Sequence, residues 1–107
     1  MANDYKNSKL DLTTTNATVL YTAPAAKTAV FKSILVSEDS GNADTITATL
    51  TDSAAAVFSL FRVKAVAANT TIELLEQPLV VETGEIIKFT AATANRLHVV
   101  ASFMEIS

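Results

Sequence analysis

The chain has 107 residues, of which 50% are hydrophobic and only 18% are charged, and its formal net charge is −3. This length accommodates one domain with one core. The acidic balance and the scattered basic residues indicate no nucleic-acid partner, which would require clustered Lys and Arg. Cysteine is absent, which excludes disulfides and thiolate metal sites. A surface with so few charges predicts that part of it is covered by another subunit.

Residues 1–8 are polar and are predicted to form a flexible N-terminal arm, which either remains free or reaches a neighbouring subunit. Residues 9–107 are predicted to form a single β-sandwich domain. The N-terminal segment lacks the apolar run of a secretory signal, and no stretch of the sequence is long enough to span a bilayer. We therefore expect synthesis in the cytoplasm and no membrane partner.

Segments rich in Thr, Val and Ile alternate with turn-forming residues at intervals of about ten residues. This pattern predicts an all-β fold: one antiparallel β-sandwich of about eight strands, with either a jelly-roll or an immunoglobulin-like strand order. The predicted strands cover residues 10–14, 17–22, 27–37, 45–51, 56–66, 70–76, 78–81, 86–91 and 97–106. Alanines in 56–66 also allow a helix, but its valines favour a strand, and the uneven alternation at Leu60 and Phe61 predicts a bulge.

Residues 78–89 give the clearest local signal, two apolar strands joined by a tight turn at residues 82–85. Gly84 is expected to take a positive φ in this turn, because it has no Cβ to clash with the backbone. The segment therefore predicts a β-hairpin. Its side chains expected in the core are Leu79, Val81, Ile87 and Phe89, and those expected to meet a partner at the tip are Glu82 and Glu85.

Residues 45–51 alternate most regularly between apolar and polar side chains. Ile46, Ala48 and Leu50 are expected to face the core, as on a sheet with one buried face. The opposite face carries four threonines: Thr45, Thr47, Thr49 and Thr51. This uncharged β surface is either solvated or packed against another chain.

Residues capable of catalysis or of metal binding are sparse, so we expect neither an enzyme nor a cofactor. His98 is the only histidine and lies in a predicted strand, and no Ser-His-Asp set or nucleophile elbow is present. Gly41 and Gly84 alone cannot build a phosphate-binding loop. Residues 39–44 gather oxygen ligands as a calcium loop does, but without the EF-hand spacing. A solvated turn is favoured there, and ion binding by residues 38–44 stays open.

An ordered series of turn and strand segments resembles the small β-sandwich virion proteins of tailed bacteriophages, especially phages of marine bacteria and cyanobacteria. The series comprises YTAPA at 21–25, KSI at 32–34, LVVETGEII at 79–87, Asn95 and a closing valine-rich strand. The resemblance covers about residues 19–106. In such proteins the strand after the YTAP segment often ends in Asn, whereas Ser37 and Glu38 stand there in this chain, so loop contacts are expected to differ.

The resemblance implies a structural protein of the virion, most simply a capsid decoration or cement protein. Its expected partners are further copies of itself, with a trimer favoured, and the major capsid protein or other virion proteins. A neck, tail or fibre component is the first alternative, and a carbohydrate-binding β-sandwich is the second. The residues expected at the interface are Asp4, Tyr5, Lys6 and Lys9 of the arm and the threonine row Thr45, Thr47, Thr49 and Thr51.

Overall fold

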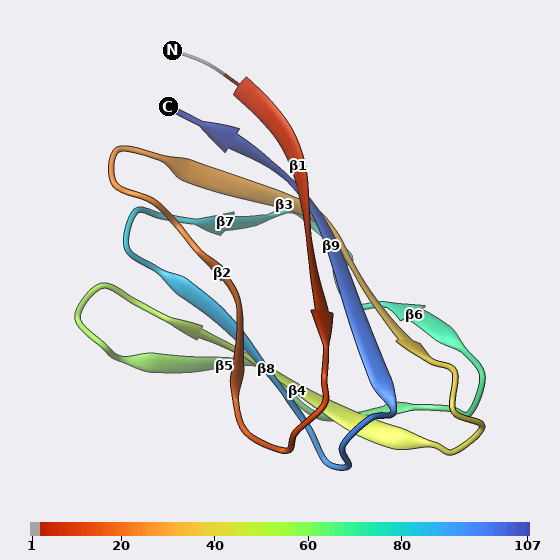
Figure 1. Cartoon of the computed structure of the whole chain (residues 1–107). Helices are drawn as coiled ribbons and strands as arrows, with labels where there is room; N and C mark the ends of the chain where they lie inside the picture. Colours follow the sequence, from red (N-terminus) through yellow and green to blue (C-terminus); the bar gives the residue numbers. More distant parts are fainter. Residues whose placement is uncertain (1–2) are drawn as a thin grey trace.

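The computed structural model describes residues 3–107, in which nine β-strands form two antiparallel sheets packed face to face (Figure 1). The predicted all-β sandwich is therefore confirmed. The strands are β1 (Asn3–Asp11), β2 (Thr18–Thr22), β3 (Thr28–Glu38), β4 (Asp44–Thr51), β5 (Val57–Val66), β6 (Thr71–Glu73), β7 (Leu79–Val81), β8 (Ile86–Ala91) and β9 (Leu97–Ile106). Most of them lie within one or two residues of the predicted segments, and 57–66 is a strand rather than a helix.

The strand order is that of a jelly roll. One sheet, here called sheet A, has the order β1-β9-β3-β6, with β7 also paired to β3. The other, sheet B, has the order β2-β8-β4-β5. The pairs β1–β9, β2–β8, β3 with β6 and β7, and β4–β5 are nested, as in a long hairpin rolled into two sheets. Of the two strand orders that the sequence left open, the structure has the jelly roll.

The core lies between the sheets and is built by the alternation of each strand. In β9, for example, Leu97, Val99, Ala101 and Phe103 point inward and are buried. Phe31 of β3 stacks on Phe103 with ring centroids 4.6 Å apart, and Tyr21 of β2 lies against both rings. Burial of such side chains is the main stabilising term for a domain without disulfides.

The predicted hairpin at residues 78–89 is wrong in its pairing, although its turn and its core residues are right. β7 pairs with β3 in sheet A, whereas β8 pairs with β2 and β4 in sheet B. The turn therefore carries the chain from one sheet to the other. Gly84 has φ +82° as expected, and its N–H donates to the carbonyl of Ala23 (3.0 Å). Alternation alone cannot tell which sheet a strand joins, because both faces of the fold obey it.

The predicted flexible arm is corrected from Asn3 onward, and Met1 and Ala2 lie outside the described residues. Asn3 to Ser8 belong to β1, which pairs with β9 without interruption from Asn3 opposite Ile106 to Asp11 opposite His98. The sequence favoured an arm because the segment is polar. In the sheet, however, it is an edge strand exposed on most of its surface, and polar residues suit that position.

The bulge predicted near Leu60 is confirmed, and a second irregularity follows it. The pairing register between β4 and β5 shifts twice, once on each side of Ala48. At the first shift Leu60 is an extra residue in β5, and at the second the extra residue of β5 lies at 62–63. Val63 has φ +52°, which is unusual for a β-branched residue. Its N–H donates to Oγ1 of Thr47 (3.0 Å), and this bond holds the strand in the bulged conformation.

Candidate interaction surfaces

The predicted arm residues all lie on β1 but point to two different sides of sheet A. Tyr5 and Lys9 are on its outer face, opposite Met104 and Val100 of β9. Tyr5 is the most exposed large hydrophobic side chain of the described residues, with 79% of its surface accessible. Asp4 and Lys6 alternate to the inner side of the sheet, opposite Glu105 and Phe103 of β9.

Lys6 ties β1 to a buried carboxylate. Its Nζ lies 2.7 Å from Oε1 of Glu105, and Nζ of Lys27 lies 3.7 Å from the same oxygen. The hydroxyl of Tyr21 donates to Oε2 of Glu105 (2.6 Å). The hydrogen bonds from Lys6 and Tyr21 lower the pKa of Glu105, and burial raises the pKa of the Tyr21 hydroxyl. Lys6 is thus occupied within its own chain and is less available to a partner than the sequence implied.

The predicted threonine row is present on β4 but is half-buried rather than open. Thr45, Thr47, Thr49 and Thr51 alternate with the buried Ile46 and Ala48. β4 is a central strand between β8 and β5, and Thr47 already accepts the amide of Val63. Neighbouring strands therefore take up part of the surface that these threonines would offer to another chain.

The two predicted sets are not brought together. The β1 residues lie at the edge of sheet A, and the threonine row lies on the outer face of sheet B, across the thickness of the sandwich. One flat contact cannot cover both (Figure 1). If both sets bind partners, they do so through separate interfaces.

The turn at residues 38–44, for which ion binding was left open, is organised over residues 38–42 by a buried carboxylate of the chain itself. Glu38 accepts hydrogen bonds from the amides of Ser40 (2.9 Å), Gly41 (3.1 Å), Asn42 (3.2 Å) and Asn69 (3.1 Å), and from the hydroxyl of Ser40. Burial alone would raise the pKa of Glu38, but these donors outweigh it and lower the pKa to about 2. Among residues 3–107, no group of three His, Cys, Asp or Glu side chains is placed to hold a metal ion.

Three acids of the described residues are buried, Glu38, Asp44 and Glu105, and for Glu38 and Glu105 the sequence carried a signal that was missed. Every second residue of a strand points to the same face. Glu38 therefore follows Ile34 and Val36 on the inward face of β3, and Glu105 follows Ala101 and Phe103 on the inward face of β9. Extending each alternation by one step would have placed the carboxylate inside. Each acid joins segments that are distant in sequence: Glu38 accepts the amide of Asn69, and Glu105 binds Lys6 and Tyr21.

An apolar row on the outer face of sheet A was also missed. Tyr5, Met104, Val30 and Val80 are opposite one another in register across β1, β9, β3 and β7. Val100 and Leu35 form a second exposed pair further along β9 and β3. The edge strand β5 adds three more exposed apolar side chains: Val57, Phe58 and Val63. Contiguous apolar surface of this kind commonly marks a contact with another molecule.

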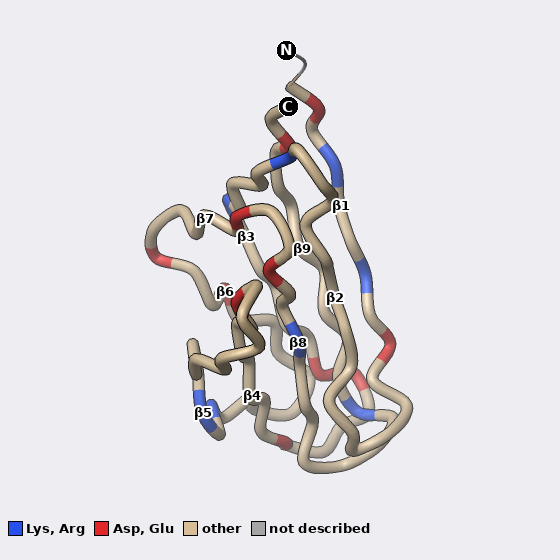
Figure 2. Tube along the Cα trace, turned by 90° about the vertical axis from the view of Figure 1, so that its left-hand side faces the viewer, with Lys and Arg blue, Asp and Glu red and all other residues tan. Residues whose placement is uncertain are grey.

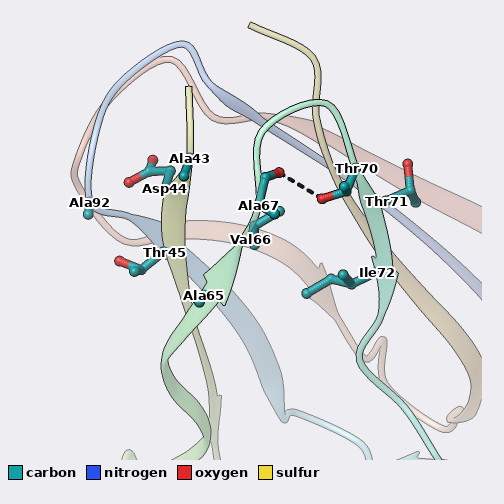
Figure 3. A pocket seen from close by; sticks show the side chains of 10 residues that line it. All are labelled: Ala43, Asp44, Thr45, Ala65, Val66, Ala67, Thr70, Thr71, Ile72 and Ala92. Atoms are coloured by element: carbon teal, nitrogen blue, oxygen red, sulfur yellow. Dashed lines mark hydrogen bonds between the residues drawn. The ribbon is translucent and has the colours of Figure 1, made fainter. Parts of the chain in front are cut away.

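An open pocket of about 880 Å³ lies where the ends of β4 and β5 face β6 (Figure 3). Ala65, Val66 and Ile72 supply much of its apolar lining. Two of its polar side chains are already engaged, since Thr70 donates to the carbonyl of Ala67 (2.7 Å) and Asp44 accepts the amide of Thr93 (3.0 Å). The pocket is chemically suited to receive an apolar side chain.

Charged residues are interspersed along the chain rather than collected on one face (Figure 2). His98 is partly exposed between two carboxylates, with Nε2 3.2 Å from Asp11 and Nδ1 3.7 Å from Asp39. The described part of the chain contains no helix long and apolar enough to cross a membrane.

The fold and these surfaces define the class of protein as a small jelly-roll β-sandwich with apolar outer patches. In comparisons with known proteins, no family model matches the chain and no curated protein sequence matches it.

Proposed function

We propose that the chain is a non-enzymatic structural protein of a bacteriophage virion, a capsid decoration or cement protein that stabilises the shell. In this role it binds as an oligomer, for which we propose a trimer, over joints between major capsid protein subunits. Fold analogy points in the same direction, because jelly rolls are common among viral capsid proteins, but function depends on the surface rather than on the fold.

The observation that carries the proposal is the apolar row on the outer face of sheet A. Tyr5 and Val80 stand at its two ends and are 79% and 50% exposed. Leaving such side chains in water is unfavourable, by roughly 25 cal/mol for each Å² of apolar surface that a partner would cover. A protein with few charges and an apolar sheet face gains this free energy on assembly.

Repetition over a shell would make modest contacts sufficient. A stable contact buries about 800 Å² on each partner. A cement subunit that bridges two or three capsid subunits makes several smaller contacts at once, and their combined affinity exceeds that of any single one through a high effective concentration. No catalytic group or bound ion is needed for this role.

The first experiment places the protein in the particle. Mass spectrometry of separated heads and tails is expected to find it in heads, at a copy number that is a simple multiple of the capsid symmetry. Its presence only in tails would refute the decoration role and support the alternative of a neck, tail or fibre component. Its absence from purified particles would refute the virion role altogether.

A second experiment tests the surface with two similarly exposed valines. Val80, 50% exposed, lies in the apolar row of sheet A, and Val19, 46% exposed, lies on β2 of sheet B. We expect Val80→Lys to reduce rebinding of purified protein to particles that lack it by about tenfold or more, since a buried unpaired ammonium costs well over 1.4 kcal/mol. Val19→Lys is expected to rebind normally. If Val19→Lys fails to rebind and Val80→Lys rebinds normally, the contact with the capsid lies on the outer face of sheet B, which carries the threonine row.

A further inference from the structure

β1 is an unusually regular edge strand. Its nine residues, Asn3–Asp11, pair with β9 in one register without a bulge. In the described part of the chain no other strand pairs with β1, so its far edge presents unpaired N–H and C=O groups. The opposite edge strand of the sandwich, β5, is by contrast irregular because of its bulges. Of these two edge strands, β1 is the one suited to extend a sheet.

The backbone groups that face this free edge can be assigned. The N–H of Leu12 donates to the carbonyl of Leu97 (3.1 Å), on the side of β9. Because hydrogen-bonding direction alternates along an antiparallel strand, the even-numbered residues bond to β9 and the odd-numbered ones point outward. Tyr5, Asn7 and Lys9 therefore direct their amide and carbonyl groups at the free edge.

We propose that two copies of this chain pair through their β1 strands, antiparallel, about a two-fold axis that passes between Asn7 and the partner's Asn7. Sheet A of one copy then continues into sheet A of the other. In this arrangement Tyr5 lies opposite Lys9 of the partner subunit, and Asn3 lies opposite Asp11 of the partner subunit. About eight N–H···O bonds form between the two strands, because each outward-facing residue exchanges two with its opposite. The exception is the Asn3–Asp11 pair, in which the carbonyl of Asp11 already accepts the amide of Thr13 (2.9 Å).

Charge selects this register. A two-fold axis perpendicular to the sheet places odd-numbered residues opposite odd-numbered ones and even-numbered residues opposite even-numbered ones. The axis therefore lies between one residue and the same residue of the partner. Centred on Asn7, all nine residues pair and no like charges are opposed. Centred on Lys6, the two Lys6 side chains face each other, which is destabilising. Centred on Ser8, only residues 5–11 can pair. Charged side chains on an edge strand normally block pairing with another strand. The register centred on Asn7 pairs all nine residues of β1 without placing like charges opposite each other.

The closest like charges in the proposed pair are the two Lys6 side chains, which become diagonal neighbours. Each is neutralised within its own copy, since Nζ of Lys6 lies 2.7 Å from the buried carboxylate of Glu105. Tyr5 gains a partner as well, because the ammonium and the aliphatic stem of the partner's Lys9 can cover its exposed ring. The pairing thus uses the side chain that is most exposed in the isolated chain.

This contact does not depend on the proposed virion role and does not by itself build a trimer. It uses an edge, whereas the outer face of sheet A stays free. The apolar row that ends at Tyr5 then continues through the partner's Lys9 to the partner's Val100 and Leu35.

The absence of cysteine makes a direct test possible, since any disulfide must come from introduced residues. Asn7→Cys places two thiols on the axis with Cα atoms about 5.5 Å apart, within the range that a disulfide spans. At micromolar protein under mild oxidation, we expect this variant to form a disulfide dimer about 100-fold faster than Asn16→Cys, an exposed turn residue away from the edge. The reason is that paired thiols have an effective concentration in the millimolar range.

A mixed experiment fixes the register. Tyr5→Cys and Lys9→Cys are each expected to cross-link poorly alone but to give a heterodimer when mixed. Equal, slow cross-linking of Asn7→Cys and Asn16→Cys would overturn the proposal, and efficient dimerisation of Ser8→Cys in place of Asn7→Cys would overturn the register. Unchanged circular dichroism shows that each variant is folded. Because purified protein alone is used, failure here is distinguishable from failure to find the protein in virions.

Discussion

Val63 offers a sharp test of the structure, because replacing it by glycine should stabilise the protein relative to the same change nearby. Val63 lies in the edge strand β5 with φ +52° and is 60% exposed. Val57 lies in the same strand with a negative φ and is 63% exposed. Val63→Gly and Val57→Gly therefore remove the same side chain from similar surroundings and differ mainly in the backbone conformation they release.

The magnitude follows from that difference. A left-handed conformation costs an L-residue about 1–2 kcal/mol, a cost that glycine does not carry. Glycine in a strand interior costs about 0.5–1 kcal/mol in lost chain entropy at either position. Val63→Gly is therefore expected to be neutral or stabilising, and Val57→Gly destabilising, with a difference of about 1–2 kcal/mol. For a chain of this length the entropy of unfolding is about 0.22 kcal/mol per kelvin, so the two Tm values should differ by about 4–9 °C.

Differential scanning calorimetry of the two variants beside the parent protein measures this directly. If Val63→Gly lowers Tm as much as Val57→Gly does, the backbone of Val63 is not strained and the bulge has another cause. A confirmed gain would show that the left-handed backbone of Val63 costs stability, as residues held in sparsely populated backbone regions do.

Three further predictions concern the buried acid, the core and the turns. Glu38→Gln should make the free energy of unfolding depend less on pH in acid. The pKa of Glu38 is about 2 in the folded chain, so its ionised carboxylate contributes fully to stability above about pH 5, and this contribution is lost as the pH falls toward 2. The variant should therefore take up about one proton fewer than the parent protein when it unfolds in this range. Denaturant midpoints measured from pH 7 to pH 2 test this, and parallel curves for the two proteins would contradict it. Phe31→Ala should cost about 3–5 kcal/mol by urea denaturation, because the ring is fully buried and stacked; a loss below about 1 kcal/mol would mean that the aromatic cluster is not packed as described. Gly84→Ala and Gly41→Ala should each lose about 1–2 kcal/mol by urea denaturation, because both glycines have positive φ and their added methyl groups meet only ordinary contacts, with Ser53 at 3.4 Å and Asn69 at 3.9 Å. A negligible loss at either position would contradict the left-handed backbone there.

Much of the fold could be read from local pattern. The alternation in residues 45–51 placed Ile46 and Ala48 in the core, and Gly84 marked its turn, because both effects act within a few residues. The site was read less well. Lys6 was predicted as a free interface residue, yet it binds Glu105, which is distant in sequence. No local pattern indicates that a lysine on the first strand will meet a glutamate on the last.

Most strands, the turns and the apolar side of each strand could be predicted from the sequence, since these depend on β-propensity, period-two alternation and turn chemistry. How the strands combine could not be predicted in this way. The folded chain separates β7 and β8 into different sheets, places the polar N-terminal segment in an edge strand, and aligns Tyr5, Met104, Val30 and Val80 in one row on the outer face of sheet A. These outcomes depend on contacts between residues far apart in the chain, and the proposed contacts of this protein depend on them.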